Sequence, residues 1–90
     1  MNTTLILKSL ADDMRLSIVR KLAKDGCEDA GIDIVSDCAN ALRLSQPTMS
    51  HHFARLVQAG VLLERKAGKE KFYRLNVQLL ESIGIDPKKL

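Results

Sequence analysis

Apolar residues recur at three- and four-residue spacings through the first sixty positions of the chain, as on one face of an α-helix. The pattern predicts a short apolar helix around residues 5–10. It also predicts a second helix that Asp12 or Asp13 caps and that Gly26 ends. A third helix is expected from about residue 34 to 43, and the residues on its inner face would be Ile34, Cys38, Ala41 and Leu42.

The fourth predicted helix, residues 45–59, begins in a stretch of small polar side chains. Ser45 is a favourable N-cap, Pro47 fits the first turn, where its missing N–H costs nothing, and Gly60 supplies the left-handed position that ends the helix. Helical spacing turns four residues toward the core: Met49, Phe53, Leu56 and Val57. It leaves six facing outward or beside that face: Gln46, Pro47, Ser50, His51, Arg55 and Gln58.

A β-hairpin is predicted next, with strands at 61–66 and 70–75 and a basic turn at 67–69. A last short helix is expected over about 78–83. This order of elements is the pattern of a winged helix-turn-helix: a helix, a tight turn, a helix with outward polar side chains and a lysine-rich hairpin. The predicted fold class is therefore mainly α with a small β-hairpin, in which helices precede a two-stranded wing and a short C-terminal helix.

Length and composition indicate a single globular domain over residues 1–90, with 46% hydrophobic and 28% charged residues. No apolar run approaches membrane-spanning length, and the first residues lack the layout of a signal peptide. We therefore expect a cytoplasmic protein with no membrane partner.

The positive charge is concentrated in one part of the chain. Residues 1–42 carry five basic and seven acidic side chains, whereas residues 43–74 carry seven basic and two acidic ones. The remaining residues balance at zero. This asymmetry favours a polyanionic partner for one face of the protein.

Three blocks of sequence resemble the ArsR family of bacterial repressors, and the match runs from about residue 7 to residue 80. The blocks are Leu7–Asp12 followed by Arg15–Val19; Leu44–Phe53 followed by Leu56 and Ala59–Leu62; and Arg65–Lys69 followed by Phe72–Leu75.

The resemblance implies a homodimeric transcriptional regulator that binds double-stranded DNA. We expect neither enzymatic activity nor a cofactor. The fourth helix would enter the major groove and the hairpin would lie against the backbone as a wing. The first and last helices would form the dimer interface, through Leu5, Ile6, Leu10, Leu79, Leu80 and Ile83.

The chemistry of the fourth helix and the hairpin supports contacts with DNA. The free amides and partial positive charge of a helix N-terminus favour a phosphate, Gln46 can pair with an adenine edge, and Ser50 and His51 can each form a hydrogen bond to guanine or phosphate. Basic hairpin residues add attraction that weakens as salt rises. The predicted DNA contacts are Ser45, Gln46, Thr48, Ser50, His51, Arg55, Arg65, Lys66, Lys69 and Lys71.

Other interpretations of the same residues are weaker. His51 and His52 point about 100° apart on a helix, which is unsuited to one metal ion, and His52 is expected to be partly buried. A nucleophilic Ser50 would need an orienting acid and an oxyanion site, and neither is visible nearby. A protein-interaction module with weak DNA binding remains the alternative function. RNA binding is a third alternative, but the sequence lacks the aromatic residues on a sheet face that would stack on RNA bases.

The effector is unknown from sequence. The family's usual metal-sensing positions hold Ile34 and Ser36, which are poor soft-metal ligands, and residues 77–81 contain no histidine. A thiol switch between Cys27 and Cys38 is an alternative mode of sensing, with Cys38 expected to be buried and Cys27 exposed. The acidic loop at 25–31 is expected to be solvated. A hard cation bound by Glu28, Asp29 and Asp33 is the lesser alternative.

Overall fold

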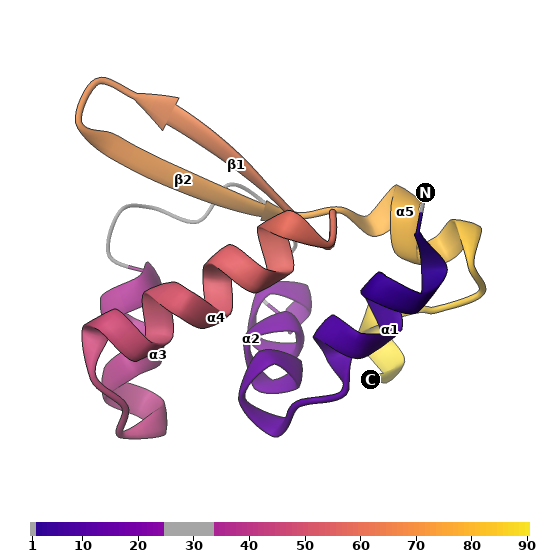
Figure 1. Ribbon diagram of the computed structural model, residues 1–90, viewed down its shortest axis with the longest axis horizontal. Helices are drawn as coiled ribbons and strands as arrows, with labels where there is room; N and C mark the ends of the chain where they lie inside the picture. The colour runs from indigo at the N-terminus through magenta and orange to yellow at the C-terminus, as the bar shows by residue number, and fades with distance from the viewer. Residues whose placement is uncertain (1, 25–33) are drawn as a thin grey trace.

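The computed structural model describes residues 2–24 and 34–90 (Figure 1). Its elements, in chain order, are α1 (Thr3–Leu10), α2 (Asp13–Lys24), α3 (Ile34–Leu42), α4 (Gln46–Gln58), β1 (Leu62–Ala67), β2 (Glu70–Leu75), α5 (Val77–Ser82) and a 3₁₀ turn, η1 (Pro87–Lys89). The predicted fold class is confirmed: helices precede an antiparallel two-stranded hairpin and a short C-terminal helix.

The hydrophobic core lies where α4 crosses α1, α2 and the base of the hairpin. Met49, Phe53 and Leu56 of α4 are all 0% exposed, as their spacing predicted. The Phe53 ring meets the Tyr73 ring of β2 edge to face, with ring centroids 4.9 Å apart. This contact joins the fourth helix to the wing.

The turn between α3 and α4 is built from local hydrogen bonds. Arg43 takes a positive φ of 56°, and the Leu44 N–H donates to the Ala39 carbonyl at 2.9 Å. This closes α3 at Leu42, one residue earlier than predicted, because the left-handed residue cannot continue the helix. The inner face also differs from the prediction, since Ala41 is exposed and Ala39 is buried.

The second helix begins as the sequence indicated. The carboxylate of Asp12 accepts hydrogen bonds from the N–H groups of Met14 and Arg15, so Asp12 rather than Asp13 is the cap. The helix is described as far as Lys24. Gly26 and the acidic loop predicted at 25–31 lie outside the described residues.

The hairpin pairs Leu62 with Leu75 at its base and Ala67 with Glu70 at its tip. Its loop has two residues, Gly68 and Lys69, one fewer than expected, and Gly68 has a φ of 65°. Glycine first in a two-residue loop matches the right-handed twist of the strands. Figure 1 shows the wing extending beyond the helices, over the side on which α4 begins.

Asn76 fixes the start of α5 to the end of α4. Its side-chain Nδ2 donates to the Gly60 carbonyl at 2.9 Å, and its side-chain Oδ1 accepts from the Leu79 N–H at 3.2 Å. The helix runs from Val77 to Ser82, shifted one residue toward the N-terminus from the prediction. The chain then folds back so that η1 contacts α2. Within the described ranges, we find no helix with the length and apolar character to cross a membrane.

We expect Gly60→Ala to destabilise the protein more than Gly84→Ala. Both glycines have a φ above 80°, which costs an L-residue about 1–2 kcal/mol. A Cβ at Gly60 would also come within 3.2 Å of Leu79 Cδ2, whereas one at Gly84 meets nothing within 4 Å. Urea denaturation measures both free energies of unfolding, and equal losses would contradict the steric part of this explanation.

Candidate nucleic-acid interface

One face of α4 is exposed and polar, while the opposite face is buried. Gln46, Ser50, His51 and Arg55 are exposed, as predicted. The buried face packs into the core, so the polar face cannot turn inward without exposing it. The helix therefore presents a fixed row of hydrogen-bonding groups to the outside.

The start of α4 is held by a pair of hydroxyls. The Ser45 Oγ accepts from the Thr48 N–H at 3.3 Å and donates to the Thr48 Oγ1 at 2.8 Å. Both side chains are exposed. Because the Thr48 hydroxyl accepts a hydrogen bond from Ser45, the hydroxyl hydrogen of Thr48 points away from Ser45. It can therefore be donated to an oxygen outside the protein.

His51 and Arg55 form a pair one helical turn apart. The Arg55 Nε donates to the His51 Nε2 at 3.3 Å, so this nitrogen is unprotonated and the ring hydrogen is on Nδ1. The imidazole can then donate one hydrogen bond from Nδ1. The terminal nitrogens of Arg55 are left for other acceptors, such as a phosphate.

His52 is partly buried, as predicted, and contacts a residue that sequence reasoning missed. Its Nδ1 lies 3.2 Å from the Arg15 Nη1, and because a guanidinium only donates, the imidazole accepts. Arg15 is on α2, 37 positions earlier in the chain. Periodicity carries no signal for such a long-range contact.

The predicted basic residues of the wing are exposed, but they lie in different environments. Arg65 stacks over the Phe72 ring, with its Cζ 4.6 Å from the centroid. On the other face, Lys66 lies opposite Lys71, whose Nζ is 4.0 Å from the Glu64 Oε1. Glu64 therefore offsets part of the charge of this pair.

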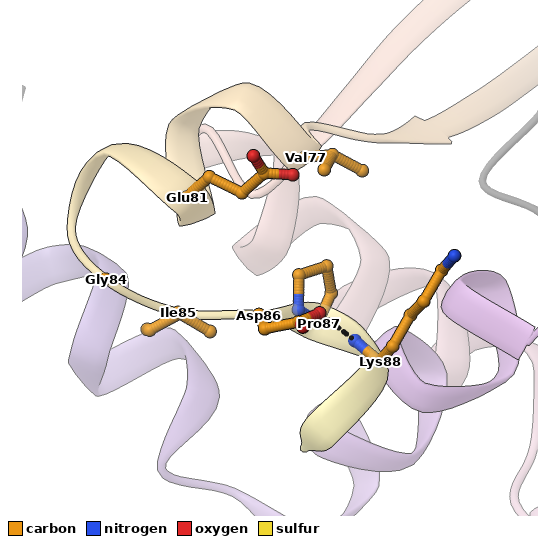
Figure 2. Close-up of a pocket in the computed structure, with 7 residues that line it drawn as sticks. All are labelled: Val77, Glu81, Gly84, Ile85, Asp86, Pro87 and Lys88. Carbon is orange, nitrogen blue, oxygen red and sulfur yellow. Dashed lines mark hydrogen bonds between the residues drawn. The ribbon is translucent and has the colours of Figure 1, made fainter.

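A cleft of about 380 Å³ separates the start of α4 from the wing. It brings together four of the predicted contact residues and two carboxylates that the prediction did not consider. The residues that line it are Val35, Gln46, Ser50, Ala54, Glu64, Lys69, Glu70, Lys71 and Tyr73. The larger hollow in Figure 2, of about 650 Å³, lies between α5 and the C-terminal segment and contains none of the predicted contact residues.

The dimer interface predicted from the first and last helices needs correction. Ile6 and Leu80 are 0% exposed and Leu10 is 9% exposed, so these side chains belong to the protein's own core. They cannot form a surface for a second subunit. Leu5, at 39%, and Leu7, at 51%, are the exposed large apolar residues of α1.

The described residues bear only in part on effector sensing. Cys38 is 2% exposed, in agreement with its predicted burial, whereas Cys27 lies outside the described ranges. The thiol switch therefore stays a prediction. In residues 2–24 and 34–90, no group of three or more histidine, cysteine or acidic side chains is arranged to hold a metal ion.

The fold and this exposed helix together define a winged helix-turn-helix protein. Residues 12–62 match the family model described as "Bacterial regulatory protein, arsR family", and the chain belongs to that family. It is 44% identical over 71 residues to an arsenical resistance operon repressor of Escherichia coli, with 79% of this chain and 56% of that protein covered.

A second relative and a solved structure are also similar to this chain. The chain is 36% identical over 77 residues to an arsenic resistance transcriptional regulator of Pseudomonas putida, covering 83% of the chain and 55% of that protein. The transcriptional repressor PagR of Bacillus anthracis superposes with a TM-score of 0.66 at 32% identity, covering 87% of this chain and 83% of the other. The chain thus spans little more than half the length of the two curated relatives.

We expect the phenol of Tyr73 to titrate above its ordinary value. Burial, and secondarily the nearby Glu64 carboxylate, raises the pKa of Tyr73 above 10.0. Because the folded pKa is the higher one, this residue's contribution to stability is complete below the unfolded pKa and is lost as pH rises through the folded value.

Tyr73 is the chain's single tyrosine, so its ultraviolet absorbance reports this group alone. Circular dichroism identifies the pH range in which the protein stays folded. Glu64→Gln should lower the midpoint while leaving it above 10.0, since burial is the larger cause. A folded protein whose Tyr73 titrates at the ordinary value would contradict this account.

Proposed function

We propose that this protein is a cytoplasmic transcriptional repressor, without enzymatic activity, that binds double-stranded DNA as a homodimer. The observation that carries the proposal is the exposed polar face of α4, held rigidly over the core and next to a basic wing. The similarity to the Escherichia coli repressor supports this direction of regulation.

The recognition helix, α4, has the dimensions for a major groove. Its 13 residues span about 20 Å, and the groove of B-DNA is about 12 Å wide. Gln46 would pair with an adenine edge, while Ser50 and the Nδ1 of His51 would donate to guanine or phosphate. Arg55 would bind a phosphate, and Ser45 and Thr48 would place the helix start against another.

The wing would supply mostly sequence-independent attraction. Lys66, Lys69 and Lys71 can approach phosphates on one strand, and Arg65 is oriented by Phe72. Glu64 and Glu70 oppose this attraction within the cleft. The wing would therefore orient the recognition helix with only moderate non-specific binding.

The N-terminal helix is the proposed dimer surface. Leu5 and Leu7 expose apolar area that a second copy would cover, and a two-fold axis would place two recognition helices on successive turns of one DNA face. Leu79 and Ile83, both partly buried, can extend the surface from α5.

DNA binding should be specific and salt-dependent. Selection from a random duplex pool should enrich one sequence, and fluorescence anisotropy with that duplex should give a logarithmic affinity that falls by about 0.9 per neutralised phosphate per decade of salt. Gln46→Ala should cost about 1–3 kcal/mol on the selected duplex, whereas Lys69→Ala should weaken all duplexes and reduce the salt slope by about 1.

The matched control is Gln78→Ala, which removes an exposed glutamine on α5. It should leave affinity and slope unchanged. Absence of both enrichment and a salt slope would instead favour the protein-interaction module.

Self-association should depend on α1. Leu7→Glu places a charge on the proposed apolar interface and should weaken dimerisation at least about tenfold. Leu63→Glu is the control, because Leu63 is a similarly exposed leucine on the wing, at 39%. Sedimentation equilibrium measures both, and a dimer that survives Leu7→Glu would place the interface elsewhere.

A further inference from the structure

Arg15 joins three helices through one side chain. Its Nε donates to the Ser9 carbonyl of α1 at 2.7 Å, and its Nη1 donates to the His52 Nδ1 of α4 at 3.2 Å. Its Nη2 lies 3.9 Å from the Asp12 carboxylate at the α1–α2 junction. The backbone N–H of Arg15 also donates to Asp12 and fixes the start of α2.

Each of these contacts restricts a different movement. The Ser9 carbonyl is in the last turn of α1, where helix carbonyls lack partners from a following turn, and Arg15 supplies a donor for this one. Asp12 accepts from the Arg15 backbone and lies beside its guanidinium, and these interactions hold the pKa of that carboxyl below its ordinary value despite the opposing effect of burial. The carboxylate therefore stays charged and keeps the guanidinium in place.

The contact with His52 acts on the rotation of α4. The buried stripe of Met49, Phe53 and Leu56 holds α4 on the core through apolar contacts, which are not directional. A hydrogen bond is directional, and this one joins the middle of α4 to the guanidinium. Rotating a helix by about 10° moves the ends of its side chains by about 1 Å, which exceeds the tolerance of a binding site.

We propose that Arg15 is a positioning residue for DNA reading: by its hydrogen bond to His52 it sets the rotation of the recognition helix relative to α1, and so controls sequence discrimination more than overall affinity. The inference rests on the proposed function. It assigns a role to His52 although this histidine faces away from the proposed DNA surface, and it links the proposed dimer helix to the helix that reads the bases.

The test compares affinity for the selected duplex with affinity for a scrambled duplex of equal length and composition. His52→Ala removes the acceptor from α4 and leaves the other Arg15 contacts. We expect about a tenfold loss on the selected duplex and less than about a twofold loss on the scrambled one, because phosphate contacts tolerate rotation better than base contacts do.

A conservative variant separates positioning from packing. His52→Asn places an amide oxygen near the position of Nδ1, so it should restore discrimination to within about twofold of the wild type. Arg15→Lys removes the planar fork and should reduce discrimination as His52→Ala does. Combined, the two substitutions should cost little more than either alone, since both remove the same contact.

Two controls complete the design. Arg20→Lys makes the same chemical change at an exposed position of α2, and Gly84→Ala lowers stability away from α4. Neither should change the ratio of the two affinities. Urea denaturation confirms that each variant is folded under the binding conditions.

Three outcomes overturn the inference: unchanged discrimination in folded His52→Ala, equal losses on both duplexes, or additive effects of Arg15→Lys and His52→Ala. If the wild-type protein itself selects no duplex, the proposed function fails instead. The two failures are therefore distinguishable.

Discussion

The burial of one stripe of α4 is the constraint on which the rest of the molecule depends. Met49, Phe53 and Leu56 are fully enclosed, and burying such side chains contributes about 1.5–3 kcal/mol each. Because helical geometry separates faces, the same burial forces Gln46, Ser50 and His51 into solvent. The edge-to-face contact between Phe53 and Tyr73 also fixes the position of the wing relative to α4.

Short connections at both ends of α4 keep the helix in one orientation on the core. Ser45 caps α4 immediately after a turn closed by the Leu44 N–H, and Gly60 ends α4 with bonds from its own N–H and that of Val61 to carbonyls of the last turn. Asn76 then ties this end to α5. Neither end of the helix has a long loop that would let it tilt independently of the core.

Local chemistry explains what the sequence predicted well. The cap at Ser45, the left-handed Gly60 and the buried stripe of α4 depend on residues close in the chain, and all were confirmed. The prediction failed where the outcome depends on other elements. Periodicity marks Ile6 and Leu80 as apolar but does not tell whether a core or a second subunit covers them.

The same limit applies to Arg15 and Arg43. From sequence, an arginine near a capping aspartate is expected to form an ordinary surface ion pair. Only the folded structure shows that His52 lies beside Arg15. Arg43 occupies a left-handed position that usually selects glycine, so the sequence lacks the glycine that would have located the end of α3 to the residue. Side chains that join distant segments, or that accept an unfavourable backbone, are defined by the assembled structure.

The distribution of charge suggests why the recognition helix, rather than the wing, would decide where the protein binds. Non-specific affinity grows with each phosphate that is neutralised, and genomic DNA offers a vast excess of non-specific sites. Glu64 lies 4.0 Å from Lys71, and Glu70 lines the same cleft, so the wing's positive charge is partly offset beside the proposed base-reading residues. Modest non-specific binding would leave discrimination between sequences to the groups on α4, which requires that α4 is held in one orientation. The buried stripe would hold α4 on the core by burying apolar area, and the hydrogen bond between Arg15 and His52 would fix its rotation because that bond is directional.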